Sequence, residues 1–162
     1  GLIPRGPAGG NYTYVMTGAT TTPFIVSAFM KGIKNFDINL AYEGMRKDHF
    51  PGGMMSKSGY EHNTSIGGGI EYYIDRGYIP YPLSKIKYGS HQDGGGQTLE
   101  YAYQDWTLAQ LAKKLNHQED YDYFMARSNN YQNVFDKSIV ALSMLIPWLL
   151  CTVIAQARRS GT

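Results

Sequence analysis

The sequence predicts an all-α fold, and three observations lead to this prediction. Apolar residues recur at helical spacing in five stretches, which clusters of Gly, Pro and Asn separate. Residues with β-propensity occur in 12–16 and 78–83, but Pro80 and Pro82 interrupt the second of these stretches. The connections between the five stretches are short, which favours antiparallel helical neighbours. No repeat of fixed period is present, so a solenoid is not predicted.

The first three predicted helices lie in the N-terminal half of the chain. The first covers about 22–33 and has Phe24 on its apolar face. The second covers about 38–47, and the third covers about 66–76. Glycine is the residue that most often ends a helix, so we expect the third helix to stop at Gly77.

The fourth predicted helix is the longest and covers about 97–115. It carries two apolar stripes, so we expect it to be buried on more than one side.

A fifth helix is predicted to follow Asn116 and to run to about Val134. Asn116 suits the N-cap position, and Glu119 three residues later fits a capping box.

The composition changes near Asp136, where we place a domain boundary. All 14 tyrosines lie before this residue, whereas 139–155 is a nearly continuous apolar run. We therefore expect one domain over 1–136 and an unrelated apolar tail over 137–162. As a helix, 139–155 would be about 25 Å long, which is slightly short of a bilayer core of about 30 Å. We favour translated non-coding or frame-shifted sequence over a membrane span for this tail.

The charge of the chain argues against a nucleic-acid-binding surface. The formal net charge is +2, but Lys137, Arg158 and Arg159 contribute to it from the tail, while all 13 acidic residues lie at or before Asp136. The body is therefore close to neutral and lacks the clustered cations that phosphate binding requires.

The single cysteine, Cys151, excludes an intramolecular disulfide framework.

Two acidic residues stand out because each lies in an apolar and aromatic stretch, TLEYAYQDW. A carboxylate among such neighbours is costly unless it is paired or used, which makes Glu100 and Asp105 candidates for function. The alternative is that Glu100 accepts hydrogen bonds from tyrosines or backbone amides and does no chemistry. Glu61 and His62 are adjacent in a polar loop, where they could contact a sugar or a metal or make ordinary loop contacts.

The glycine-rich loop 84–96 lacks the Lys-Ser/Thr ending of a phosphate-binding loop.

Five stretches of the sequence carry a resemblance to a known family: GGNYTYVMTG, FMKGIKNFD, GYEHN, GQTLEYAYQDWTLAQLAKKL and EDYDYFMARSNNYQNVFD. They resemble glycoside hydrolase family 92. The resemblance covers almost all of 1–136, and TLEYAYxDW is the most specific of these motifs. It implies part of an (α/α)6 barrel and the activity of a calcium-dependent, exo-acting, inverting alpha-mannosidase. Mannose-containing glycans are then the expected substrates, and a secreted, periplasmic or secretory-pathway location is expected.

The resemblance also assigns roles to individual residues. Glu100, the acid of TLEY, is implied to be the general acid. Glu61, His62, Tyr101 and Asp105 are implied to bind the substrate. In the family, the general base and most calcium ligands lie further downstream, where we find no counterparts in this chain. We therefore expect the chain to be inactive alone.

Two other classes of function remain open. The chain could be a non-catalytic carbohydrate-binding remnant, in which tyrosines and Trp106 stack on sugars. It could also be a helical protein anchored through 139–155.

One departure from the family concerns the segment after MTG, where an acid is often found and this sequence has Ala19.

Overall fold

The described residues form an α-helical structure. The computed structural model describes residues 1–5, 17–57, 68–81, 94–136 and 141–142. The α-helices in these segments are α1 (Thr21–Met30), α2 (Ile38–Asp48), α3 (Ile70–Arg76), α4 (Gly94–Lys114) and α5 (Gln118–Ser128). Two 3-10 helices, η1 (Met54–Ser56) and η2 (Asn129–Val134), and two short strands, β1 (Phe135–Asp136) and β2 (Ala141–Leu142), complete the list. The strands pair antiparallel, with Phe135 opposite Leu142. The all-α prediction is confirmed.

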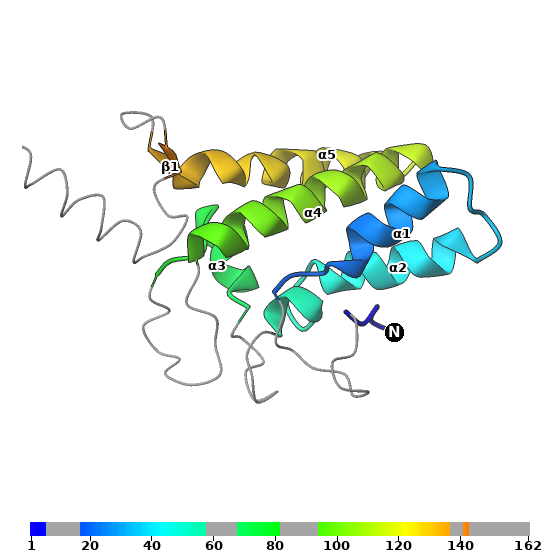
Figure 1. Cartoon of the computed structure of the whole chain (residues 1–162), viewed down its shortest axis with the longest axis horizontal. Coiled ribbons are helices and arrows are strands. Elements are labelled where there is room, and N and C mark those ends of the chain that lie inside the picture. Colours follow the sequence, from blue (N-terminus) through cyan, green and yellow to red (C-terminus); the bar gives the residue numbers. More distant parts are fainter. Residues whose placement is uncertain (6–16, 58–67, 82–93, 137–140, 143–162) are drawn as a thin grey trace, which may run out of the picture.

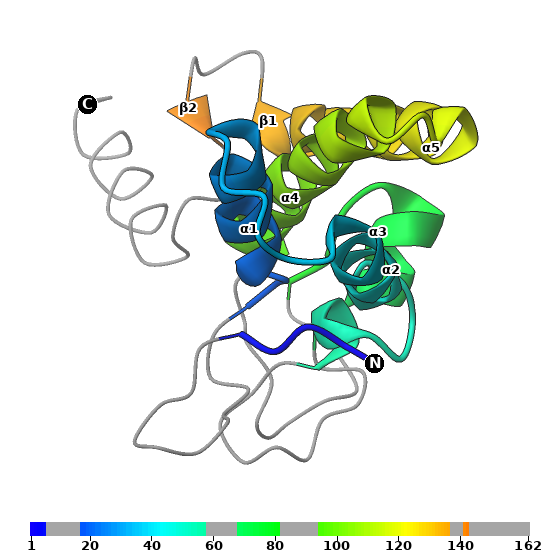
Figure 2. The ribbon, with the colours of Figure 1, turned by 90° about the vertical axis from the view of Figure 1, so that its right-hand side faces the viewer.

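Helix α4 occupies the centre of the structure. Helix α5 runs back alongside it, while α1 and α2 lie on its other side (Figure 1). The view from the end shows α2 and α3 below α4, and α1 beside it (Figure 2). The prediction that the longest helix is buried on more than one side is therefore confirmed.

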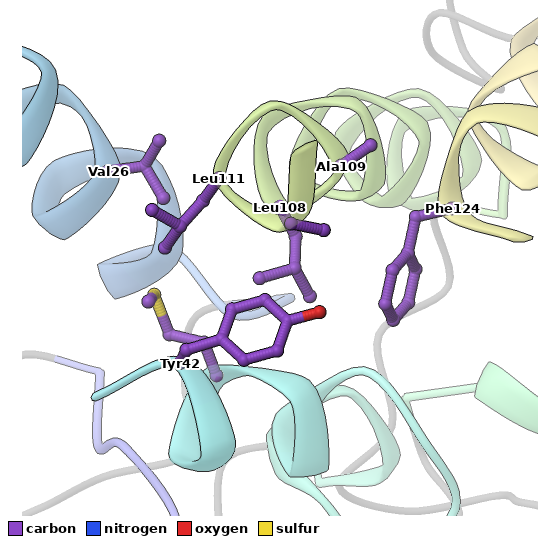
Figure 3. Packing of buried hydrophobic residues seen from close by; sticks show 8 residues of the cluster. Val26, Tyr42, Leu108, Ala109, Leu111 and Phe124 are labelled. Atoms are coloured by element: carbon purple, nitrogen blue, oxygen red, sulfur yellow. The ribbon is translucent and has the colours of Figure 1, made fainter. Parts of the chain in front are cut away.

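The larger apolar core fills the space enclosed by α1, α2, α4 and α5 (Figure 3). Its buried members are Val26, Tyr42, Met45, Leu108, Ala109, Leu111, Ala112 and Phe124. The contribution of α4 consists of two neighbouring pairs one turn apart, Leu108–Ala109 and Leu111–Ala112, which cover one side of the helix. Burial of such side chains stabilises the fold by about 1.5–3 kcal/mol for each large apolar residue.

A second core joins the first half of α4 to α3 and η1. Its buried members are Ala19, Met54, Met55, Ile70, Tyr73, Ile79 and Tyr101. Two close backbone contacts bring these segments together. A Cβ at Gly68 would lie 1.8 Å from the carbonyl oxygen of Met55, and one at Gly94 would lie 2.3 Å from that of Ile79. Only glycine allows the backbones to approach so closely.

Local sequence signals explain where two helices begin and end. The Asp37 carboxylate caps α2 by accepting hydrogen bonds from the backbone N–H groups of Asn39 and Leu40, each at 3.0 Å. Helix α3 stops at Gly77, which has φ +75° and donates its N–H to the carbonyl oxygen of Tyr73. The predicted end of this helix is confirmed.

Asn116 does not cap α5, so that prediction was wrong. Its φ is +63°, and it ends α4 in a Schellman motif, in which His117 N–H bonds the Ala112 carbonyl and Asn116 N–H bonds the Lys113 carbonyl. The N-cap of α5 is His117, and its side chain makes no capping hydrogen bond. The fifth predicted helix is also shorter than expected, because η2 takes over at Asn129.

Two further expectations concern the surface and the strands. Phe24 was expected on an apolar face, yet its side chain is 74% exposed, and Thr22 and Val26 form the buried side of α1. The described part of the second predicted strand, 78–81, is not a strand, and 12–16 lies outside the described residues. No helix among the residues that the structure describes is long and apolar enough to cross a membrane. The apolar run 139–155 lies almost entirely outside them.

Candidate active site around Glu100

Glu100 lies in the second turn of α4, and its side chain is partly exposed. The Gln104 side chain, one helical turn later, donates a hydrogen bond from Nε2 to Glu100 Oε1 at 2.6 Å. The amide oxygen of Gln104 accepts the N–H of Ala19 at 2.6 Å. Gln104 thus connects the candidate acid to the turn that precedes α1. Since the backbone N–H of Ala19 makes this contact, it does not depend on the side chain at position 19, where the family often has an acid.

Asp105 is the centre of a buried cluster of ionisable side chains. Arg127 on α5 binds both of its carboxylate oxygens, through Nε to Oδ2 at 2.6 Å and through Nη2 to Oδ1. The hydroxyl of Tyr73 donates to Oδ2 at 3.0 Å, and His49 Nδ1 lies 2.8 Å from Oδ1. The Asp105 side chain is fully buried. Burial alone would raise the pKa of Asp105, but Arg127 and His49 hold it below its usual value.

The same contacts define the protonation state and tautomer of His49. Burial and the nearby charge of Arg127 lower its pKa more than the neighbouring Asp105 raises it, so the imidazole is neutral at pH 7. The ionised Asp105 carboxylate can only accept, so the His49 proton lies on Nδ1. Nε2 then accepts a hydrogen bond from the hydroxyl of Thr22 at 3.2 Å. The cluster therefore links α1, the end of α2, α3, α4 and α5 through hydrogen bonds.

Tyr101 lies inside the second core. Its hydroxyl is 2.6 Å from the carbonyl oxygen of Gly68 and 3.0 Å from that of Met55. The side chain is fully buried, and burial raises its pKa, so it remains a neutral donor. The structure thus gives Tyr101 and Asp105 partners within the protein, and their expected contact with a sugar stays a prediction. Glu61 and His62 lie outside the described residues.

An exposed aromatic pair lies on α4 beside the candidate acid. The rings of Tyr103 and Trp106 are stacked 6.4 Å apart, with an angle of 18° between their planes. The side chains are 52% and 47% exposed. Grooves border the pair on both sides, one towards Met30 on α1 and one towards Tyr131 on η2. This surface has the planar faces that stack on sugar rings, and equally the apolar character of a surface on which further helices pack.

The described residues do not form a calcium site. Within these segments, no three His, Cys, Asp or Glu side chains gather in a way that could hold a metal ion. Asp105 is fully buried on the same helix as Glu100, and Arg127, His49 and Tyr73 occupy its oxygens. The residues that the structure describes therefore do not fit the calcium ion that the family resemblance implies.

Sequence reasoning missed two of these features. The Glu100–Gln104 contact has a signal, since residues four apart on a helix are neighbours. No local signal in the sequence predicts that Asp105 binds Arg127 and His49, because these residues come from separate segments.

The chain is similar in sequence to a known catalytic domain. The family model of the glycosyl hydrolase family 92 catalytic domain matches residues 1–161. The matched range includes the segment after Asp136 that we expected to be unrelated, so the match gives no support to a boundary there. No curated protein matches the chain.

Solved structures agree with this match. An inverting mannosidase of family GH92 from Bacteroides thetaiotaomicron VPI-5482 superposes with a TM-score of 0.66 at 30% identity, over 83% of this chain and 16% of that chain. A family GH92 alpha-mannosidase from Bacteroides thetaiotaomicron, in complex with mannoimidazole, gives 0.64 at 30% identity, over 83% and 15%. The described helices correspond to part of the (α/α) barrel of these structures, and the chain spans 15–16% of their length.

Proposed function

Because this chain belongs to glycoside hydrolase family 92, we propose that it supplies the general acid of an inverting, exo-acting alpha-mannosidase. The observation that carries the proposal is the placement of Glu100. Its carboxyl group is partly exposed on α4 and makes a hydrogen bond through Oε1 only, among the described residues. A general acid needs this combination of access to the substrate and a defined orientation.

The proposed reaction follows from the inverting mechanism. Glu100 gives its proton to the glycosidic oxygen of a terminal alpha-mannoside as the bond from that oxygen to the anomeric carbon breaks. Water attacks the anomeric carbon from the opposite face and loses its proton to a second carboxylate, about 6.5–9.5 Å from the first. The products are mannose of inverted configuration and the shortened glycan.

The second carboxylate is not Asp105. A general base must bind the attacking water, and both oxygens of Asp105 already accept hydrogen bonds in a fully buried cluster. We therefore propose that the base comes from outside this chain, which spans 16% of the length of the inverting mannosidase. Calcium, if the whole enzyme uses it, would be held by groups outside the described residues, and no step above depends on it.

Further parts of the proposal follow from the family alone. Mannose-containing glycans are the proposed substrates, and a secreted, periplasmic or secretory-pathway location is proposed. The structural neighbours support a mannose substrate, since they are an inverting mannosidase and an alpha-mannosidase in complex with mannoimidazole.

The test uses the protein encoded by the gene that carries this sequence, together with the 162-residue chain. The former should release mannose from alpha-mannosides, and Glu100→Gln should lower kcat by about 10²- to 10⁴-fold. The chain alone should release none. Mannose release by the purified chain would refute the placement of the base outside it, and full activity of Glu100→Gln would refute the role of Glu100.

A second candidate function is non-catalytic carbohydrate binding, and the exposed Tyr103–Trp106 pair favours it. Under this alternative, Trp106→Ala should weaken the binding of mannosides by the chain by about 10-fold or more, and Glu100→Gln should leave it unchanged. Isothermal titration with a mannose-containing oligosaccharide distinguishes the two functions.

A further inference from the structure

The amide of Gln104 has only one possible orientation. A backbone N–H can only donate, so the atom that faces Ala19 N–H must be the amide oxygen. The amide nitrogen then necessarily faces Glu100 Oε1, at 2.6 Å. The Gln104 side chain is fully buried, and a Cβ at Gly18 would lie 2.5 Å from its oxygen and 2.6 Å from its nitrogen. The turn before α1 therefore fits closely around this amide and prevents it from rotating.

A fixed donor at Oε1 makes the two oxygens of Glu100 different. The hydrogen bond from Gln104 to Oε1 favours a proton of the carboxyl group on Oε2, because a carbonyl oxygen accepts better than a hydroxyl oxygen. In the part of the chain that the structure describes, the hydrogen bond of the Glu100 carboxyl group is to Oε1 and not to Oε2. General acid catalysis requires the protonated oxygen to be within about 2.6–3.2 Å of the leaving oxygen.

We propose that Gln104 is a positioning residue for the general acid: held by Ala19 N–H and by the Gly18 turn, it fixes the Glu100 carboxyl group so that Oε2 delivers the proton. This inference rests on the role proposed above for Glu100. Gln104 itself touches neither the substrate nor the reacting atoms. It acts through the orientation of Glu100, and its contribution should therefore appear only in steps that need a proton.

Two substrates separate this role from a purely structural one. Departure of a sugar alcohol from mannobiose needs protonation, whereas departure of fluoride from alpha-mannosyl fluoride does not. In the protein encoded by the gene, Gln104→Met keeps the length of the side chain and removes the amide. We expect kcat for mannobiose to fall about 10- to 100-fold with little change in KM, and kcat for the fluoride to change less than about 3-fold.

A matched control is available on α5. Gln118 donates from Nε2 to Asp122 at 2.9 Å, so it also binds a carboxylate one helical turn away, but it precedes its acceptor in the sequence and lies on an exposed surface. Gln118→Met should leave both rates unchanged. Equal losses on both substrates in Gln104→Met, or no loss on mannobiose, would overturn the inference.

The outcomes distinguish this inference from the proposed function. If Glu100→Gln hydrolyses mannobiose as fast as the wild type, the role of Glu100 is wrong and the inference falls with it. If Glu100→Gln loses only mannobiose hydrolysis while Gln104→Met slows both substrates equally, the inference alone is wrong.

An NMR titration of the chain gives an answer without turnover. The side-chain amide protons of Gln104 should shift as the carboxyl group of Glu100 changes its protonation state, and Glu100→Gln should abolish this shift. The same pH-dependent shift in both proteins would also overturn the inference.

Discussion

Replacement of Arg127 by Met tests the buried cluster around Asp105. The Arg127 guanidinium makes two hydrogen bonds to Asp105 and a third, at 3.0 Å, to the carbonyl oxygen of His49. The two side chains are 6% and 0% exposed. Removal of one partner of a buried ion pair leaves an uncompensated charge, which typically costs about 3–5 kcal/mol. We therefore expect Arg127→Met to lower the free energy of unfolding by this amount at pH 7.5.

Urea denaturation followed by circular dichroism at 222 nm measures the difference. The matched control is Arg76→Met, which removes an exposed guanidinium that lies over the ring of Tyr72. It should cost less than about 1 kcal/mol. The double variant Arg127→Met/Asp105→Leu should recover much of the loss, because no buried charge is then left without a partner.

The pH dependence of Arg127→Met gives a second measure of the same effect. Arg127 lowers the pKa of His49, and Asp105 raises it. Without Arg127, we expect His49 to become protonated beside Asp105 and to compensate it in part as the pH falls towards 5.5. The loss should therefore be smaller at pH 5.5 than at pH 7.5. A loss below 1 kcal/mol at pH 7.5, or no difference from Arg76→Met, would refute the account of the cluster.

Three further variants test other features of the structure. Burial raises the pKa of Asp48 from 3.8 to about 7, so the folded chain binds this proton more tightly than the unfolded chain does. The stabilisation from protonated Asp48 is complete below about pH 4 and is lost as the pH rises through 7. Asp48→Asn should therefore raise the melting temperature relative to wild type at pH 8 but not at pH 4. Asp37→Ala removes the cap of α2 and should cost about 1 kcal/mol in urea denaturation, whereas Asp37→Asn should cost less. Gly68→Ala places a methyl group against the Met55 carbonyl and should lower the melting temperature, and an unchanged value would contradict the described approach of these segments.

The helices of this chain could be predicted from its sequence because their signals are local. Apolar spacing located α2 and α4 within three residues of their observed ends, and Gly77 marked the end of α3. Asn116 was misassigned because asparagine suits both an N-cap and a left-handed C-terminal position. Only the path of the chain between α4 and α5 decides between the two, and local sequence does not contain it.

The side of a helix that is buried was harder to predict than the helix itself. A barrel helix has neighbours on more than one side, so its apolar residues do not all face the same core. Phe24 and Trp106 are apolar and yet exposed in this chain, while Thr22 is buried against His49. The candidate acid could be proposed from its motif, whereas the fixed amide of Gln104 depends on Ala19, 85 residues earlier.

The Asp105 cluster has a consequence for synthesis on the ribosome. The partners of Asp105 lie 22, 32 and 56 positions away in the sequence, at Arg127, Tyr73 and His49. Arg127, the partner that neutralises its charge, is translated last. A nascent chain that ends within α4 would have to bury a carboxylate with no cation to balance it, so it should keep Asp105 in water. Stable docking of α4 against α2 and α3 should therefore be favoured only once α5 has left the exit tunnel.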